Sequence, residues 1–310
     1  MLSYEGEDRV CFSTFAFCDH PSSLIPQMSP QTERYLDLAQ QGRNAWWRYA
    51  LGTFTIAFFW LVLGYVPYLL LVGAGVSDQM LEYLAVNFSI FMMLAGLVLT
   101  VKLIHRRPLL SLVTPEARVD LRRVWRGALV WTVIAAVIVV IEHLLFPDRY
   151  YLSFDVERFF VFLALVLVLT PIQTTTEELV FRGYAMQGLG LLTRRPALIA
   201  VASSLVFTAP HLLNPEVHQH GVLIMAANYF VIGMLLATIT LRDGRLELAI
   251  GVHAVNNVFL ALIANYEGSA LTTESIFTAR ELDPVYSLVT MIIGTLLFHR
   301  WIFRRVSENP

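Results

Sequence analysis

Residues 161–187 read VFLALVLVLTPIQTTTEELVFRGYAMQ, and the two halves of this stretch differ sharply in polarity. The first half is almost free of polar side chains, which suits a lipid environment. The second half contains two adjacent carboxylates, Glu177 and Glu178, and the guanidinium of Arg182. Charged side chains within an apolar segment of a membrane protein indicate a functional site by default, because each is costly to bury.

The composition of the chain indicates a membrane protein. Of the 310 residues, 56% are hydrophobic and 15% are charged, whereas soluble domains carry about 25% charged residues. The formal net charge of −2 provides no basic surface, so no nucleic-acid partner is expected. The lipid bilayer is the expected surrounding of most of the chain.

Eight apolar stretches approach the roughly 20 residues that a helix needs to cross a bilayer. The predicted spans are residues 49–72, 84–104, 124–146, 160–175, 197–213, 222–241, 246–264 and 285–303. The sequence therefore predicts an all-α fold, a polytopic membrane bundle of about eight transmembrane helices. Pro171 lies inside the fourth span, so we expect a kink or a break into two helices near residues 171–176.

The arginines predict the topology. If the spans alternate in direction, most basic clusters fall on one side, while opposite loops such as residues 73–83 and 213–221 contain no Lys or Arg. The positive-inside rule then places both termini in the cytoplasm, and the arginine-rich linker favours a bacterial inner membrane. We expect a cytoplasmic tail and surface helix over residues 1–48, a transmembrane domain over 49–303 and a cytoplasmic tail over 304–310.

Helical spacing separates the two glutamates of the charged stretch. Glu178 and Arg182 are four residues apart, in the order that favours an ion pair on one face of a helix. Glu177 is five residues from Arg182 and points elsewhere, which leaves it unpaired and suited to proton transfer. The alternative is an ordinary helix start, in which residues 174–176 cap the helix and the acids interact favourably with its dipole.

Two further motifs place histidines in apolar helices. Residues 207–211, FTAPH, put Phe207 and His211 on one helical face. Residues 253–257, HAVNN, put His253 and Asn257 on one face, from which Asn256 points away. A histidine and an amide one turn apart direct two donors to one point, an arrangement that can bind an oxyanion. Hydrogen-bonded packing between helices is the alternative for both motifs.

The three motifs EELVFRG, FTAPH and HAVNN occur in this order and resemble the E-E-x-x-x-R, F-x-x-x-H and H-x-x-x-N motifs of the CaaX prenyl protease type II family. That family includes the bacterial abortive-infection and bacteriocin-processing intramembrane proteases. The resemblance covers roughly residues 160–264, the expected protease core. It implies a glutamate-dependent intramembrane endopeptidase. The expected partner is a peptide or membrane-protein substrate, lipidated in some members, whose peptide bond is cut near the membrane surface.

The resemblance also implies roles for individual residues. Glu177 would be the general base, and His211 would help to activate water. His253 and Asn257 would form the oxyanion hole. Three further residues would support the site: Glu178, Arg182 and Phe207.

No cofactor is expected, because a water held between Glu177 and His211 needs no metal. If a metal is bound, zinc held by Glu177, His211 and His253 is the expected case. Two other functions stay open: a non-catalytic membrane scaffold that keeps the fold and binds another protein, and a transporter in which the buried acid and histidines relay protons. The intact motif set favours the protease, and no internal repeat of the kind many transporters show is visible.

Overall fold

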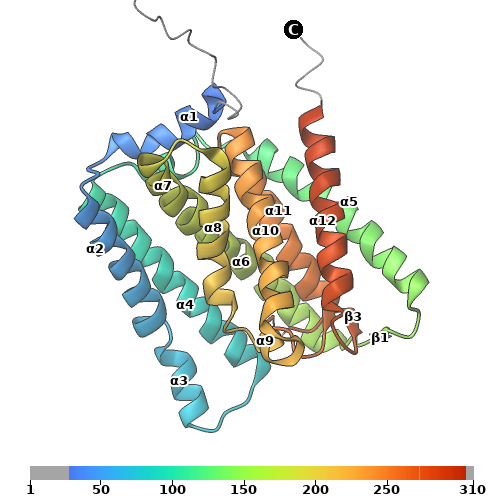
Figure 1. Ribbon diagram of the computed structural model, residues 1–310. Coiled ribbons are helices and arrows are strands. Elements are labelled where there is room, and N and C mark those ends of the chain that lie inside the picture. Colours follow the sequence, from blue (N-terminus) through green and yellow to red (C-terminus); the bar gives the residue numbers. More distant parts are fainter. Residues whose placement is uncertain (1–27, 272, 305–310) are drawn as a thin grey trace, which may run out of the picture.

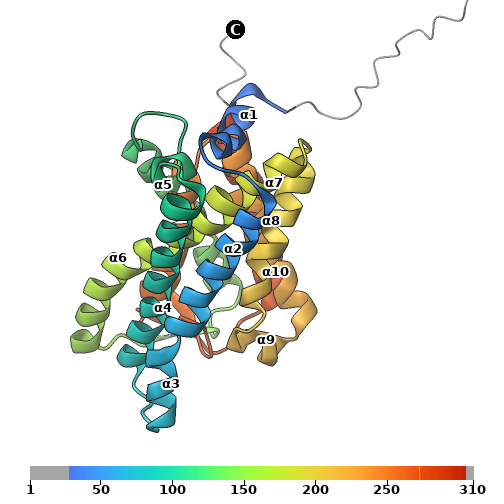
Figure 2. The ribbon, with the colours of Figure 1, turned by 90° about the vertical axis from the view of Figure 1, so that its left-hand side faces the viewer.

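A computed structural model describes residues 28–271 and 273–304, and the predicted tails lie partly outside these ranges. The described chain is a bundle of helices (Figure 1). The short helix α1 and the C-terminal end of α12 lie at the same end of the bundle. In the turned view, α2 and α4 stand in front, between α6 on one side and α8 and α10 on the other (Figure 2).

In the described part of the chain, six helical segments are long and apolar enough to cross a membrane. They are Trp46–Gly73, Gln79–His105, Leu121–Leu145, Val156–Leu192, Val222–Asp243 and Pro284–Phe303. Two further apolar helices, Pro196–His211 (α8) and Glu247–Leu262 (α11), have 16 residues each. These eight segments coincide with the eight predicted spans, but two of them are shorter than the length that usually crosses a bilayer.

Several long segments combine elements of different helical type. The first contains α2 (Trp46–Ala57), the π-helix η2 (Phe58–Leu63) and α3 (Val66–Gly73). The second contains α4 (Gln79–Leu99) and the π-helix η3 (Thr100–His105). The fourth contains α6 (Val156–Glu178), the π-helix η5 (Leu179–Ala185) and α7 (Met186–Leu192). The remaining helices are α1 (Pro30–Leu36), η1 (Asp37–Gln41), η4 (Leu109–Leu112), α5 (Leu121–Leu145), α9 (Pro215–His220), α10 (Val222–Asp243) and α12 (Pro284–Phe303).

Of the kink or break expected near residues 171–176, the break into two helices is wrong, and the kink stays a prediction. α6 runs through Pro171 without interruption to Glu178, and the irregular turn η5 follows the glutamates instead. The hydroxyl of Thr174 donates to the carbonyl oxygen of Thr170 at 3.0 Å, so a side chain adds a hydrogen bond next to the proline. Membrane helices tolerate proline where such side chains and neighbouring helices satisfy the backbone.

A small sheet is the part of the fold that an all-α expectation misses. Three strands, β1 (Tyr150–Leu152), β2 (Ala264–Tyr266) and β3 (Phe277–Ala279), pair in the order β1-β3-β2 at the end opposite α1 (Figure 1). β3 pairs antiparallel with β1 and parallel with β2. Strands of three residues are too short for an alternating pattern to reveal in the sequence.

Two glycines let α5 and α11 approach closely. A Cβ on Gly127 would overlap the carbonyl oxygen of Leu248, and one on Gly251 would overlap the carbonyl oxygen of Val124. Only glycine permits this approach, because any side chain would have to displace backbone. His253 follows Gly251 by two residues, so this contact helps to position a candidate site residue.

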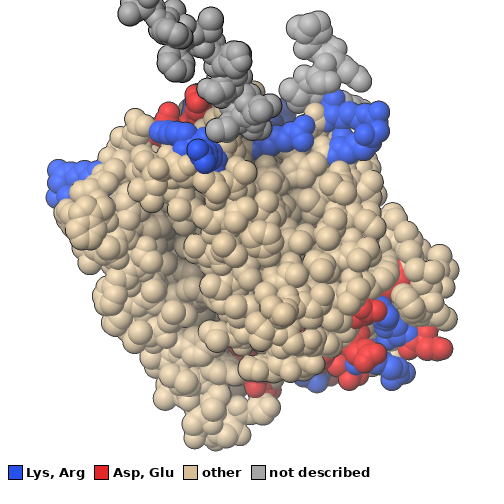
Figure 3. Space-filling view, viewed as in Figure 1, with Lys and Arg blue, Asp and Glu red and all other residues tan. Residues whose placement is uncertain are grey.

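Charged side chains gather at two ends of the bundle. Lys and Arg cluster at the end where α1 and the end of α12 lie, and acidic and basic side chains mix at the opposite end (Figure 3). The surface between them carries no visible charge in this view. Exposed leucines of the described helices include Leu205 on α8 and Leu296 on α12, at 56% and 66% exposure. The bundle is therefore an integral membrane protein.

Candidate active site

The end of α6 and the turn η5 bury three charged residues. Glu177 is 7% exposed, and Glu178 and Arg182 are fully buried. The predicted ion pair is present: Nη1 of Arg182 donates to Oε1 of Glu178 at 2.8 Å. Nη2 of Arg182 donates to the carbonyl oxygen of Gly233 on α10 at 3.2 Å, and the guanidinium lies 4.3 Å from the ring centre of Phe207 on α8. The pair therefore joins three helices.

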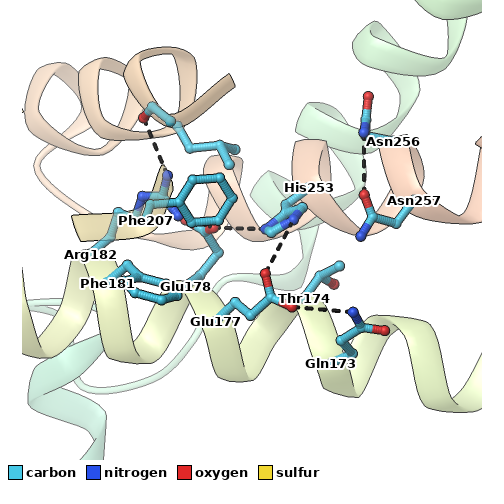
Figure 4. Close-up of polar contacts among 12 residues, drawn as sticks. Gln173, Thr174, Glu177, Glu178, Phe181, Arg182, Phe207, His253, Asn256 and Asn257 are labelled. Atoms are coloured by element: carbon cyan, nitrogen blue, oxygen red, sulfur yellow. Dashed lines mark hydrogen bonds and ion pairs between the residues drawn. The ribbon is translucent and has the colours of Figure 1, made fainter. Parts of the chain in front are cut away.

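His253 lies between the two glutamates (Figure 4). Its Nδ1 is 2.8 Å from Oε1 of Glu178, and its Nε2 is 3.8 Å from Oε2 of Glu177. An ionised carboxylate only accepts hydrogen bonds, so this contact assigns a proton to Nδ1. The other oxygen of Glu177, Oε1, accepts from Nε2 of Gln173 at 3.2 Å. Glu177 is thus held from one side by an amide and faces an imidazole on the other.

The charges of this group leave room for one more proton. Glu177, Glu178 and Arg182 together carry one net negative charge, and uncompensated charge is disfavoured in a buried site. One additional proton makes the group neutral. Nε2 of His253 and the carboxylate of Glu177 are the two positions for it, 3.8 Å apart. A proton exchanged between two neighbouring groups is what acid–base chemistry requires.

α8 supplies the second histidine. Nδ1 of His211 is 2.8 Å from the carbonyl oxygen of Phe207, which assigns a proton to Nδ1 and leaves Nε2 as an acceptor. The imidazole packs against the rings of Phe207 and Tyr229, with centroids 4.4 and 4.8 Å away. Phe207 also touches His253, at 5.9 Å between ring centroids. Phe207 therefore lies in contact with both histidines.

The amides of α11 do not follow the simple expectation for adjacent helix positions. Asn256 does not point away from Asn257: its Nδ2 donates to Oδ1 of Asn257 at 3.2 Å. Oδ1 of Asn256 in turn accepts from the indole Nε1 of Trp131 on α5 at 3.0 Å. Both amides line the same cavity. They are therefore in contact, although their Cα–Cβ bonds leave α11 in different directions. The contact leaves Nδ2 of Asn257 for a ligand.

One cavity of about 720 Å³ connects these residues. Its lining includes five of the predicted site residues: Glu177, Phe207, His211, His253 and Asn257. Glu178 and Arg182 do not line it and lie behind Glu177 and His253. The structure therefore separates the residues that can touch a ligand from the buried pair that holds them, as the helical spacing of the two glutamates suggests.

Two polar residues of the site, Gln173 and Trp131, escaped the sequence analysis, and a third, Asn256, was expected to point away from it. Gln173 precedes Glu177 by one helical turn, and this four-residue spacing is the signal that would have found it. Trp131 lies 125 residues from its partner Asn256 on another helix, so no spacing links the two.

A metal ion would need several ligating side chains close together. Over residues 28–271 and 273–304, no three or more His, Cys, Asp or Glu side chains are grouped so that they could hold a metal ion. Glu177, His211 and His253 share the cavity without forming such a group as they stand.

Comparison with known families gives a match over the segment that contains the site. Residues 156–259 match the family described as Type II CAAX prenyl endopeptidase Rce1-like. This range begins with α6 and ends within α11, so it contains every predicted site residue. The match confirms the resemblance of the three motifs: over these residues the chain is similar to the Type II CAAX prenyl endopeptidase Rce1-like family.

The similarity to one curated protein extends over most of the bundle. The chain is 28% identical to "Uncharacterized protein YyaK" of Bacillus subtilis (strain 168) over 275 residues, which is 83% of this chain and 91% of that protein. No solved structure matches the chain.

Proposed function

We propose that the protein is an intramembrane endopeptidase that hydrolyses a peptide bond near the membrane surface. The match of residues 156–259 to a prenyl endopeptidase family supports a peptidase. The observation that carries the mechanism is the environment of Glu177, which is buried, lines the cavity and faces Nε2 of His253 at 3.8 Å. Neither Lys nor Arg pairs with it among the described ion pairs, so its carboxylate is available as a base.

In the proposed reaction, Glu177 accepts a proton from a water molecule in the cavity as the water oxygen attacks the scissile carbonyl carbon. The C–N bond then breaks, and the proton passes from Glu177 to the leaving amine. Glu177 returns to its carboxylate form. Nε2 of His211, free as an acceptor, gives the water a second contact.

His253 and Asn257 are proposed to stabilise the oxyanion. Because Nδ1 of His253 already donates to Glu178, only a protonated Nε2 can donate to the substrate. The doubly protonated ring stands between two carboxylates, and in this state Glu177 is ionised and ready to act as the base. The free Nδ2 of Asn257 supplies the second donor. Preorganised donors of this kind contribute about 10²- to 10³-fold each in other hydrolases.

The proposed substrate is a peptide or a membrane-protein segment, with or without a lipid. We place the protein in the bacterial inner membrane with both termini in the cytoplasm. The cluster of Lys and Arg at the end of the bundle near α1 supports this orientation (Figure 3).

The test compares wild type with Glu177→Ala and Glu177→Gln, purified in detergent. Each is incubated with membranes from a deletion strain or with a prenylated CaaX peptide, and products are identified by mass spectrometry. Glu267→Gln serves as the control, because Glu267 is an exposed carboxylate outside the cavity. Products that vanish in both Glu177 variants, persist in the control and survive a chelator establish a glutamate peptidase.

Two other results would change the proposal. Products that are lost on chelation and restored by zinc would assign a metal to Glu177, His211 and His253. If wild type cuts nothing, while wild type and Glu177→Ala capture the same membrane protein, a non-catalytic scaffold is the better description.

A further inference from the structure

The cavity contains more negative charge than the proposed hydrolysis uses. The described residues that line it include six carboxylates and neither Lys nor Arg. The carboxylates are Glu82, Glu142, Glu177, Glu216, Glu281 and Asp283. Arg149, behind the wall, pairs with Glu142 at 2.7 Å and with Asp283 at 3.0 Å. Two of the six are therefore paired with one cation, whose single charge offsets one of their two negative charges, and Glu177 belongs to the catalytic group.

Glu216 is the most buried of the other three. It lies in α9 and is 3% exposed. Its Oε1 accepts hydrogen bonds from the hydroxyl of Tyr229 and, at 3.3 Å, from that of Tyr266. Its Oε2 is buried and has no hydrogen-bond partner among residues 28–271 and 273–304. None of the ion pairs formed by the described residues includes Glu216.

The hydroxyl partners hold one oxygen without supplying a counter-charge. Burial and the neighbouring Glu216 carboxylate raise the pKa of Tyr266, so its hydroxyl stays protonated and remains a donor. Nδ2 of Asn214 donates to the hydroxyl of Tyr229 at 2.9 Å, which orients that hydroxyl toward Glu216. The network therefore fixes the carboxylate, while burying it without a cation costs several kcal/mol.

Glu216 is close to the proposed catalytic residues. Tyr229, which donates to Glu216, also packs against the imidazole of His211 with 4.8 Å between ring centroids. A single aromatic side chain thus touches both residues. Glu216, His211 and Glu177 line the same cavity, so one bound polypeptide can reach all three.

We propose that Glu216 determines substrate specificity by binding a positively charged side chain, Lys or Arg, of the substrate polypeptide on one side of the scissile bond. The substrate cation supplies the counter-charge that the protein itself does not, and Oε2 is the atom that accepts its hydrogen bond. The same wall has no Lys or Arg to pair with a free C-terminal carboxylate, so it favours a bond flanked by a basic residue. This inference rests on the proposed endopeptidase function.

The test uses two apolar 12-residue peptides that differ only at one position, lysine or its uncharged analogue norleucine, placed in turn at each site around the scissile bond. Wild type is expected to cut the best lysine peptide with a kcat/KM about 10- to 100-fold above that of its norleucine partner, the range for hydrogen bonds to charged groups. Glu216→Gln, which keeps the shape of the side chain, should remove this preference and leave the norleucine peptide unchanged. Glu267→Gln should keep the preference.

Two results would overturn the proposal: equal cleavage of both peptides by wild type, or an equal loss for both peptides in Glu216→Gln, which indicates a purely structural role. Tyr266→Phe removes one donor but keeps the carboxylate, so this variant should retain the lysine preference. Loss of the preference in Tyr266→Phe at an unchanged unfolding temperature would also contradict the proposal.

A binding measurement separates this inference from the proposed function. Fluorescence anisotropy of labelled peptides is recorded with Glu177→Gln and with Glu177→Gln/Glu216→Gln, so that no turnover is needed. Tighter binding of the lysine peptide that depends on Glu216, without cleavage by wild type, would refute the peptidase and support the cation site. Cleavage by wild type with equal binding of both peptides would refute the cation site and support the peptidase.

Discussion

His253 is hydrogen-bonded to Glu178, not to Glu177, and shares its acceptor with Arg182. One oxygen, Oε1 of Glu178, accepts from Nδ1 of His253 and from Nη1 of Arg182, each at 2.8 Å. The ion pair and the orientation of the histidine are therefore a single unit. Oε2 of Glu178 is buried without a partner, which makes the shared oxygen the only contact point of this carboxylate among the described residues.

Removing one member of the buried pair should be worse for stability than removing both. Glu178→Met leaves Arg182 buried without its partner and should lower the free energy of unfolding by about 3–5 kcal/mol. Glu178→Met/Arg182→Met should recover much of this loss but stay inactive, because His253 has lost its acceptor. Thermal unfolding in detergent and the cleavage assay measure the two effects.

An exposed pair provides the control for this prediction. Asp37→Asn removes the partner of Arg194, where both side chains are nearly half exposed, and should change stability by less than about 1 kcal/mol. Activity in the double methionine variant would contradict the proposed role of Glu178.

Gln173 should affect the reaction more than the fold. Gln173→Ala removes the hydrogen bond to Glu177, and such bonds to charged groups contribute about 1.5–3 kcal/mol. We expect kcat to fall about 10-fold or more with an unfolding temperature close to that of wild type. Gln79→Ala, which removes an exposed partner of Arg158, is the matched control. A kcat equal to that of wild type would show that Gln173 does not position the base.

Side chains at Gly251 should separate α11 from α5. Gly251→Ala places a methyl group against the backbone of Val124, and overpacking of this kind costs about 1–3 kcal/mol. Because His253 is two residues away, cleavage should fall together with stability. Gly73→Ala is the control, since a Cβ there meets nothing within 4 Å. Equal behaviour of the two variants would mean that the contact between α5 and α11 is not tight in the membrane.

The end of the bundle that carries the sheet should lose stability in acid. The backbone N–H of Tyr286 and the guanidinium of Arg149 hold the pKa of Asp283 below its ordinary 3.8. A depressed folded-state pKa stabilises the protein above the unfolded value, and the contribution is lost as the pH falls through the folded value. Asp283→Ala should therefore cost about 1 kcal/mol near pH 7, the usual value of a helix cap.

The difference between Asp283→Ala and wild type should narrow below pH 3.8. Unfolding temperatures measured across this pH range test the prediction. A difference that stays constant would show that the carboxylate charge does not contribute. Asp148 precedes Arg149 in the sequence but forms none of the described ion pairs, so Asp148→Ala should show no such pH dependence.

The sequence predicts contacts between residues a few positions apart well, and contacts between residues far apart in the chain poorly. The pairing of Glu178 with Arg182 followed from a four-residue spacing, and the helices followed from long apolar runs. The contact of His253 with Glu178 joins residues 75 positions apart and depends on how α11 packs. That packing depends on close contacts such as the one between Gly251 and α5. The periodic pattern of apolar residues in the sequence does not predict such contacts. The catalytic roles of Glu177, His211, His253 and Asn257 stay predictions.

Two other differences between prediction and structure, at Pro171 and at Asn256, also involve contacts that local sequence patterns do not include. The helix continued through Pro171, and the hydroxyl of Thr174 adds a hydrogen bond to the carbonyl oxygen of Thr170 beside it, a contact that propensity alone does not include. Asn256 turned toward Asn257 because Trp131, on another helix, holds its amide oxygen.

The lengths of α8 and α11 have a consequence for the surrounding membrane. Each has 16 residues, and at 1.5 Å per residue each spans about 24 Å, less than the roughly 30 Å of a typical hydrocarbon layer. α8, which carries His211, has exposed side chains such as Leu205, so the layer has to thin beside it, whereas α11, which carries His253, has no exposed residue. Mismatch costs fractions of a kcal/mol per Å. The acyl-chain length of the phospholipids around α8 therefore becomes a control on how close bulk solvent comes to His211.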